Sequence, residues 1–403
     1  MARLIFLGSM AYLMVGLAQL VIGTVMEPMV HAYGVLYGDG GQLVMHQFLG
    51  GMTGTLAAPW LIRRFGRKVP LLSALVLIAV MQAVYAMHPP WPVMLALGPL
   101  TGLGFGLTET TVGSFVIVAA AGNANKAMSR IEVFFGAGAL LMPFLGSWLI
   151  ANGWWRMSFV AVSIFAAATF LAWTLLWPKI LDSSSASAQA PADSASQERE
   201  IRTIRPARGT VGWTLGVCIL FFLVYVGFEM SFVHYLPSLM VQTNGLSDAE
   251  ASLSISLYWT AMTVGRMVAG HAADRFGGAA YLVSMCAVNA VCFLLMTGFS
   301  GVTSTLVLTA VSGLAMSGMF SIALVFANRA VPGITERTTS LLMAAGGIGG
   351  ALLPKLTGWF LDRFQEDMTR WLFAAFGILL LLVIVWAAAL ASRSSRKNIV
   401  MEA

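Results

Sequence analysis

Charge is what this sequence has least of. Of its 403 residues, only 10% are Asp, Glu, Lys or Arg, whereas 58% are hydrophobic. A water-soluble domain carries about 25% charged residues, because its surface must face water. A chain this poor in charge is expected to have an apolar exterior, which excludes an ordinary soluble enzyme and indicates a protein embedded in lipid.

Cysteine is also scarce, and its placement argues against two kinds of site. The three cysteines, Cys218, Cys286 and Cys292, all lie inside apolar segments, and no CxxC pair occurs. We expect them to be small packing residues rather than parts of a disulfide or a metal site. The five histidines are dispersed without an i,i+4 pair, so no metal site is predicted from them either.

Nucleotide and catalytic motifs are missing as well. No P-loop occurs, which excludes an ATP-driven pump on this chain. The glycine-rich runs lie inside apolar segments, whereas a dinucleotide fold needs a strand before its glycine-rich turn. No Ser-His-Asp or Cys-His arrangement can be assigned. We therefore expect no enzymatic activity, no catalytic residues and no cofactor.

Long apolar runs are what the sequence has in abundance. A helix needs roughly 17–25 apolar residues to cross a bilayer, and a backbone in lipid must satisfy its own hydrogen bonds, so these runs are predicted to be helices. The first run follows a single Arg and is too long for a signal-peptide core, so it is expected to be retained as a span. Twelve spans are predicted, near 4–36, 42–62, 69–88, 92–120, 127–151, 154–178, 210–240, 248–272, 278–298, 302–330, 336–360 and 367–392.

The basic residues predict the orientation. Positively charged residues favour the cytoplasmic loops of membrane proteins. With a cytoplasmic N-terminus, eighteen Lys and Arg residues fall in the inner segments, and only Arg156, Arg363 and Arg370 fall in the outer loops. Both termini are therefore predicted to be cytoplasmic, in the inner membrane of the cell. The net charge of +6 is assigned to this asymmetry and not to nucleic-acid binding.

The chain is predicted to consist of two related halves. The Ser/Ala/Pro-rich stretch within 179–209 cannot bury a core, so it is expected to be a flexible cytoplasmic linker between six-helix bundles at 1–178 and 210–403. Residues 136–148 (GAGALLMPFLGSW) resemble 347–359 (GIGGALLPKLTGW), and the RFG of 64–66 resembles that of 275–277 at the same offset of 211 positions. A shared offset in separate segments indicates duplication, as in transporters built from repeats.

Two loops carry a family resemblance. LIRRFGRK (61–68) and GHAADRFGG (270–278) resemble the loop motif of the major facilitator superfamily, although Arg63 stands where Asp is usual. The resemblance implies a fold of twelve transmembrane helices in two pseudo-symmetric bundles and an inner gate, whose candidates include Arg266, the only guanidinium predicted deep in a span. Structural pairing is the other reading of Arg266. The predicted gating residues are Arg64, Arg67, Arg266, Asp274 and Arg275.

A narrower resemblance covers three spans. GLTETTVGSFVI (106–117), MSRIEVFFGAGAL (128–140) and VGFEMSFVHYLPSLM (226–240) resemble the glucose/mannose–proton symporter branch of the fucose-permease-like facilitators. This resemblance implies proton-coupled uptake of a hexose-type sugar by alternating access, in a monomer whose partners are the sugar, protons and lipid.

Acidic residues inside spans are the candidates for proton coupling. An ionisable side chain in hydrocarbon is costly, so it points to function by default. Glu109 is predicted to be the main proton carrier and a sugar-hydroxyl acceptor, with Glu132 and Glu229 as further coupling residues. The alternative for each is a structural acid bonded to a neighbouring helix. Glu27, near the outer end of the first span, is equally compatible with a solvated residue at the mouth.

A sugar site combines polar groups with an aromatic platform, since a sugar has hydroxyl rims and apolar faces. Each aromatic residue taken alone also suits simple packing. Lys355, near the end of the eleventh span, is expected to extend toward the outer surface. The predicted substrate-binding residues are Gln47, Glu109, Phe135, Tyr258, Trp259, Asn289 and Asn328.

Two other functions fit part of the same pattern. A proton-coupled exporter of drugs or other metabolites would also use buried acids, but with a large apolar cavity in place of a polar sugar site. A membrane sensor is disfavoured, because the sequence contains no appended soluble domain.

Overall fold

Helices form the described part of the chain. The structure, a computed structural model, describes residues 1–120, 124–178, 180–183, 208–330 and 335–402, and within these ranges it contains no β-strand. The helices are α1 (Ala2–Thr24), α2 (Met26–Tyr33), α3 (Tyr37–Phe65), α4 (Lys68–Ala86), α5 (Trp91–Ala120), α6 (Ala124–Ala151), α7 (Met157–Leu175), α8 (Ile180–Ser183), α10 (Arg208–Asn244), α11 (Asp248–Phe276), α12 (Gly278–Gly298), α13 (Val302–Met316), α14 (Met319–Ala330) and α15 (Thr335–Glu402).

The predicted all-α membrane fold is confirmed. Ten helical stretches in the described part are long and apolar enough to cross a membrane, and two of these, Leu341–Phe364 and Asp367–Ser392, lie within α15. The helices α3 and α11, 29 residues each, cover the two remaining predicted spans. Polar residues inside these helices, such as Gln42, His46 and Gln47 in α3, lower their mean hydropathy without shortening them. Together these stretches account for the twelve predicted spans.

Two predicted spans are interrupted. The span near 4–36 is divided at Val25, where the backbone leaves helical geometry (φ −102°, ψ 13°) between α1 and α2. The span near 302–330 is divided between α13 and α14, after Met316. The linker predicted at 179–209 lies mostly outside the described residues, which include only its parts at 180–183 and 208–209.

The contacts divide the chain into two compact units. Unit 1 contains residues 1–188, 230–260 and 354–366, and unit 2 contains residues 189–229, 261–353 and 367–403. The division falls inside α10, α11 and α15, so unit 1 includes short parts of three helices from the second half of the sequence. The halves predicted from the linker therefore differ from the compact units, because the units follow contacts rather than chain order.

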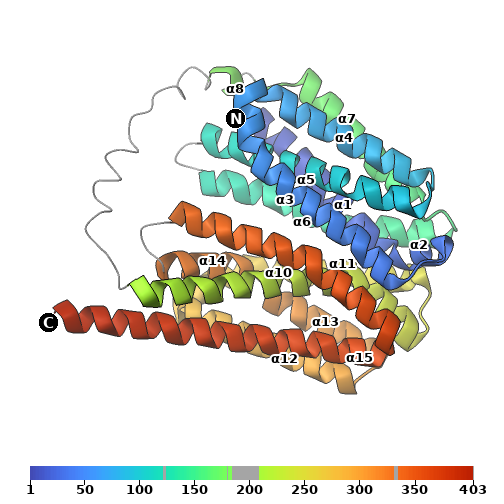
Figure 1. Cartoon of the computed structure of the whole chain (residues 1–403). Coiled ribbons are helices and arrows are strands. Elements are labelled where there is room, and N and C mark those ends of the chain that lie inside the picture. Colours follow the sequence, from blue (N-terminus) through green and yellow to red (C-terminus); the bar gives the residue numbers. More distant parts are fainter. Residues whose placement is uncertain (121–123, 179, 184–207, 331–334, 403) are drawn as a thin grey trace. The chain divides into compact units, whose positions relative to one another are not determined.

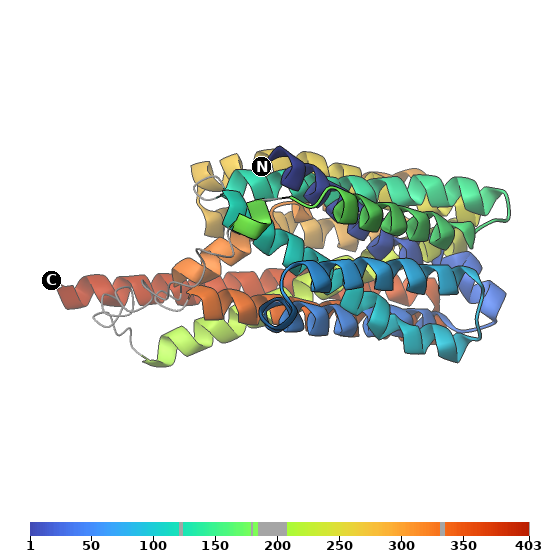
Figure 2. The same cartoon turned by 90° about the horizontal axis from the view of Figure 1, so that it is seen from above.

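Unit 1 is built mainly from the first seven helices. The helix α3 packs along α5, α1 along α6 and α4 along α7, and these helices run side by side (Figures 1 and 2). Large buried side chains such as Tyr85, Phe159 and Trp173 fill the space between them. The N-terminus and α8 lie at one end of this unit, and α2 lies at the other (Figure 1).

Unit 2 has an aromatic core. The ring of Phe228 lies 4.7 Å from that of Phe293 and 6.1 Å from that of Phe373, measured between centroids. The helix α12 packs against α13 and α14. The stretches of α15 at 335–353 and 367–402, both in this unit, run antiparallel (Figure 1).

Candidate functional site

Two predicted coupling acids come together in unit 1. Glu109 lies on α5 and Glu132 on α6, and their carboxyl groups are close enough to interact electrostatically. Tyr12 on α1 interacts with both acids, and its hydroxyl donates to the main-chain oxygen of Glu109 at 3.2 Å. Tyr12 is buried, Glu109 is half-buried and Glu132 is exposed. The structure therefore gathers two carboxyl groups and a phenol where three helices meet.

Three predicted aromatic residues lie next to one another in the same unit. The rings of Phe135 on α6 and Trp259 on α11 meet edge to face at 6.2 Å, and Tyr258 meets Trp259 at the same distance. Nearby, Ser256 donates to the main-chain oxygen of Leu140 at 3.0 Å. Phe135 follows Glu132 on α6 by three positions, about one turn, so the two side chains lie on the same face of that helix. Tyr258 and Trp259 are almost fully buried.

The third predicted acid has a cationic neighbour. Glu229 on α10 is buried in unit 2, where it interacts with the Arg266 guanidinium and the Tyr225 hydroxyl. Tyr225 also lies 3.1 Å from the main-chain oxygen of Met316. Arg266 is thus placed beside a carboxyl group, as the structural-pairing reading expected, and its Nη2 lies 3.3 Å from the sulfur of Met262.

Three amide side chains predicted to bind substrate instead lie beside polar side chains of their own compact unit. Gln47 is buried on α3 beside Tyr85. Asn289 has no exposed surface, and its amide oxygen accepts the Ser312 hydroxyl at 2.7 Å, so in this conformation it joins α12 to α13 and is not accessible to a substrate. Asn328 is half-buried and donates to Thr339 Oγ1 at 3.0 Å.

The predicted gating residues of the two loops have different surroundings. In unit 1, Arg67 donates to the main-chain oxygen of Leu181 at 2.7 Å, which ties the loop to α8, while Arg64 is exposed. In unit 2, Asp274 and Arg275 are both exposed, and the Arg275 guanidinium lies 5.7 Å from the ring of Phe276. A gating role for these four residues stays a prediction.

A polar cluster that we did not predict from the sequence holds the start of α3. The carboxylate of Asp362 accepts the main-chain N–H groups of Tyr37 and Gly38, at 2.8 and 2.6 Å. Lys355 donates to the main-chain oxygen of Gly38 at 2.8 Å and to the Gln42 side chain at 3.1 Å. A third contact comes from Tyr235, whose hydroxyl donates to the main-chain oxygen of Tyr37 at 2.7 Å. We call the residues Tyr37, Gly38, Gln42, Tyr235, Lys355 and Asp362 the α3 cap cluster.

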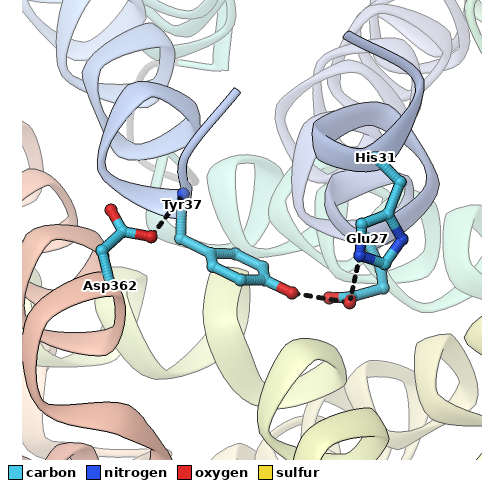
Figure 3. A network of polar contacts seen from close by, with 4 residues as sticks. All are labelled: Glu27, His31, Tyr37 and Asp362. Carbon is cyan, nitrogen blue, oxygen red and sulfur yellow. Dashed lines mark hydrogen bonds and ion pairs between the residues drawn. The ribbon is translucent and has the colours of Figure 1, made fainter. Parts of the chain in front are cut away.

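Glu27 joins this cluster through Tyr37. The hydroxyl of Tyr37 donates to Glu27 Oε1 at 2.6 Å, and His31 Nε2 lies 3.5 Å from the same oxygen. Figure 3 shows Tyr37 between Glu27 and Asp362, which it contacts with opposite ends. Glu27 is only 2% exposed, so the reading of Glu27 as a solvated residue at the mouth is wrong.

Two features of the sequence hinted at this cluster. Lys355 and Asp362 are seven positions apart, which places them on one face of a helix, and both are ionisable residues within the predicted span or just beyond its end. The amino group of Lys355 is taken up by the start of α3, and the expectation that it extends toward the outer surface stays a prediction. Their partners are more than 300 positions away and could not be read from local spacing.

Known proteins resemble the chain along most of its length. The chain is 27% identical over 375 residues to the glucose/mannose transporter GlcP of Bacillus subtilis, which covers 93% of this chain and 92% of that protein. It is 26% identical over 289 residues to the fosmidomycin resistance protein of Escherichia coli, which covers 70% and 66% of the two chains. The solved structure of the nucleoside transporter NupG (D323A mutant) superposes with a TM-score of 0.77 at 13% identity, covering 96% of this chain and 99% of that one.

A family model accounts for both halves. The model described as Major Facilitator Superfamily matches residues 8–243 and 217–400. These matches span nearly all of the helices described above, and the resemblance to the solved transporter structure is one of fold. The chain is therefore a multi-pass membrane protein that belongs to the Major Facilitator Superfamily of transporters.

Proposed function

We propose that the chain is a secondary active transporter that moves a hexose-type sugar, glucose- or mannose-like, together with protons by alternating access. The observation that carries the proposal is the pair of carboxyl groups of Glu109 and Glu132 beside Tyr12. A carboxyl group away from bulk water and next to another carboxyl group is suited to binding and releasing a proton. Glu109 is the principal carrier in this scheme, and Glu132 supports it.

The sugar class rests on two further observations. The relative in Bacillus subtilis that aligns along 93% of this chain is a glucose/mannose transporter. On the same helix as Glu132, the half-buried ring of Phe135 provides an apolar surface of the kind that stacks on a sugar face, and the buried ring of Trp259 supports it edge to face. Glu109 would then accept a sugar hydroxyl as well as a proton.

The scheme also includes a second acid and the arrangement of the protein in the membrane. Glu229 beside Arg266 is proposed as a second charged site that responds to the first. We also propose that the protein is a monomer in the cell membrane with both termini in the cytoplasm, because the basic residues favour that side. Substrate contacts by Gln47, Tyr258, Asn289 and Asn328 stay predictions, and those of Gln47, Tyr258 and Asn289 require a conformation in which these buried side chains become accessible.

A proton-coupled exporter is the second candidate. It is favoured by the similarity to the fosmidomycin resistance protein, and such an exporter would use the same acids. The shorter alignment, which covers 70% of this chain against 93% for the sugar transporter, places it second.

Uptake into proteoliposomes tests both candidates. Labelled glucose, mannose and fucose are offered under an imposed inward proton gradient. We expect gradient-driven accumulation of glucose or mannose, its loss in Glu109→Gln, and its retention in Asp367→Asn, which alters an exposed acid elsewhere. Exchange of sugar at equal concentrations should persist in Glu109→Gln, because exchange needs no net proton movement.

Two results would change the conclusion. Unchanged accumulation in Glu109→Gln would remove Glu109 from the coupling mechanism. Absence of accumulation for every sugar, together with proton-driven efflux of a lipophilic cation, would favour the exporter.

A further inference from the structure

The first turn of α3 is held by three side chains from the second repeat. Asp362 and Lys355 lie on α15 and Tyr235 lies on α10, whereas α3 belongs to the first repeat. The three segments that carry these residues, in α3, α10 and α15, are all part of unit 1. Each of the three side chains contacts the main chain of Tyr37 or Gly38.

These hydrogen bonds are of a kind that can form and break reversibly. The first N–H groups of a helix have no partner within the helix and carry partial positive charge, so they attract a carboxylate. Asp362 supplies that carboxylate to two N–H groups at once. When these hydrogen bonds break, water can satisfy the same N–H groups, so release leaves no permanently unpaired donor.

The hydrogen bonds of the α3 cap cluster also require the backbones of α3 and α15 to lie close together. A side chain at Gly41 would meet the main chain of α15 at Pro354 and Lys355, and one at Gly358 would meet the hydroxyl of Tyr235 and the main-chain oxygen of Tyr37. Glycine at both positions allows the two helices to touch without intervening side chains. The hydrogen bonds of the α3 cap cluster depend on that proximity.

We propose that the α3 cap cluster is a latch that ties the two repeats together at one end of the protein and must release in each transport cycle. In alternating access the repeats move against each other, so contacts that join repeats at a closed end have to break, whereas contacts inside one repeat do not. This inference rests on the proposed transport function but does not depend on the substrate. With cytoplasmic termini, the latched end is the outer one, and Asp362, Lys355 and Tyr235 are positioning residues of the outer gate.

Labelling of a buried reporter thiol tests the latch. Ser238 on α10 has no exposed surface and lies three positions from Tyr235, so a Ser238→Cys reporter in a background with Cys218, Cys286 and Cys292 replaced by alanine is protected while the latch is closed. We expect Asp362→Asn to raise the rate of labelling by a membrane-impermeant maleimide about ten-fold, because one of two charge-assisted hydrogen bonds is lost and the other is weakened. Asp367→Asn, the same change at an exposed acid nearby in sequence, should leave the rate unchanged.

The measurement needs neither sugar nor a proton gradient, so it is separate from the test of substrate. Faster labelling without any sugar transport would keep the latch and overturn the sugar proposal. An unchanged rate in Asp362→Asn protein that is monodisperse on gel filtration would overturn the latch. If Asp362→Asn does not fold, Lys355→Met decides in the same way, since it removes the other charged partner of the turn.

Discussion

The two ends of unit 1 are held together in different ways. At the α2 end, the α3 cap cluster joins residues whose positions in the sequence differ by as much as 325. At the α8 end, Arg67 reaches Leu181, and the amino group of Lys68 lies 5.7 Å from the ring of Trp177. The aromatic residues Phe115, Trp173 and Trp177 pack together beside this contact.

The difference lies in which repeats are connected. The contacts of the α8 end join the loop after α3 to the segment that follows α7, all within the first repeat. The contacts of the α3 cap cluster join the first repeat to the second. The comparison therefore indicates that the α2 end carries the contacts that have to change during transport, and that the α8 end preserves the shape of one bundle.

Gly358→Ala should have the largest effect on the α3 cap cluster, and therefore on the rate of Ser238→Cys labelling. The added methyl group would overlap the Tyr235 hydroxyl and the main chain at Tyr37, and overpacking costs about 1–3 kcal/mol. That cost falls on the latched form, so Ser238→Cys labelling should accelerate by roughly ten-fold or more. Gly216→Ala is the control, because nothing lies within 4 Å of the added carbon there. Equal labelling rates in the two variants would contradict the close approach.

Lys355→Met should have the next largest effect. It removes two hydrogen bonds to α3, whose net contribution is about 0.5–1.5 kcal/mol because water replaces them when the turn opens, and it leaves the Asp362 contacts in place. We expect labelling about three- to ten-fold faster than in the unchanged protein. The matched change at the opposite end, Lys68→Met, should leave Ser238→Cys labelling as it was, and an increase there would mean that both ends respond together.

Tyr37→Phe is expected to act more weakly. It removes the hydroxyl that binds Glu27 but not the main-chain groups that Asp362, Lys355 and Tyr235 contact. The loss of one hydrogen bond to a buried carboxylate should raise the labelling rate by about three-fold. A rate as high as that of Gly358→Ala would show that Glu27, rather than α15, controls the latch.

Arg67→Gln should leave the latch unaffected. It removes a charged donor from the main chain at Leu181, so we expect faster amide hydrogen exchange in Ile180–Ser183 by about ten-fold and no change in Ser238→Cys labelling. Arg67→Lys keeps the charge, so its rate of amide exchange in Ile180–Ser183 should lie between those of the unchanged protein and Arg67→Gln. Faster labelling in Arg67→Gln would contradict the assignment of the two ends to different roles.

The sequence was most informative where local composition decides the structure. Span positions follow from runs of apolar residues, because only helices satisfy the backbone in lipid, and the approach of Glu132 to Glu109 follows from two adjacent antiparallel spans. The break at Val25 was missed, although the sequence carries a signal for it: Pro28 has no N–H to donate to the carbonyl of Thr24, four residues before it. The α3 cap cluster was missed because it depends on tertiary contacts between distant helices, and local spacing does no more than place Lys355 and Asp362 on one face of a helix.

Asp362 recognises the main chain of α3 rather than any side chain on it. The N–H groups that it binds are present whatever residue occupies positions 37 and 38, and among ordinary substitutions only proline would delete one. Replacement of the Tyr37 side chain should accordingly leave the Asp362 contact in place unless it introduces proline. A side chain at Gly38 or Gly41 would instead meet Asp362 or α15, and replacement of the single acid should not be tolerated. The side-chain chemistry of the contact is concentrated on one partner, so among the polar residues of the α3 cap cluster Asp362 is the one whose replacement should give the largest effect in a mutational scan.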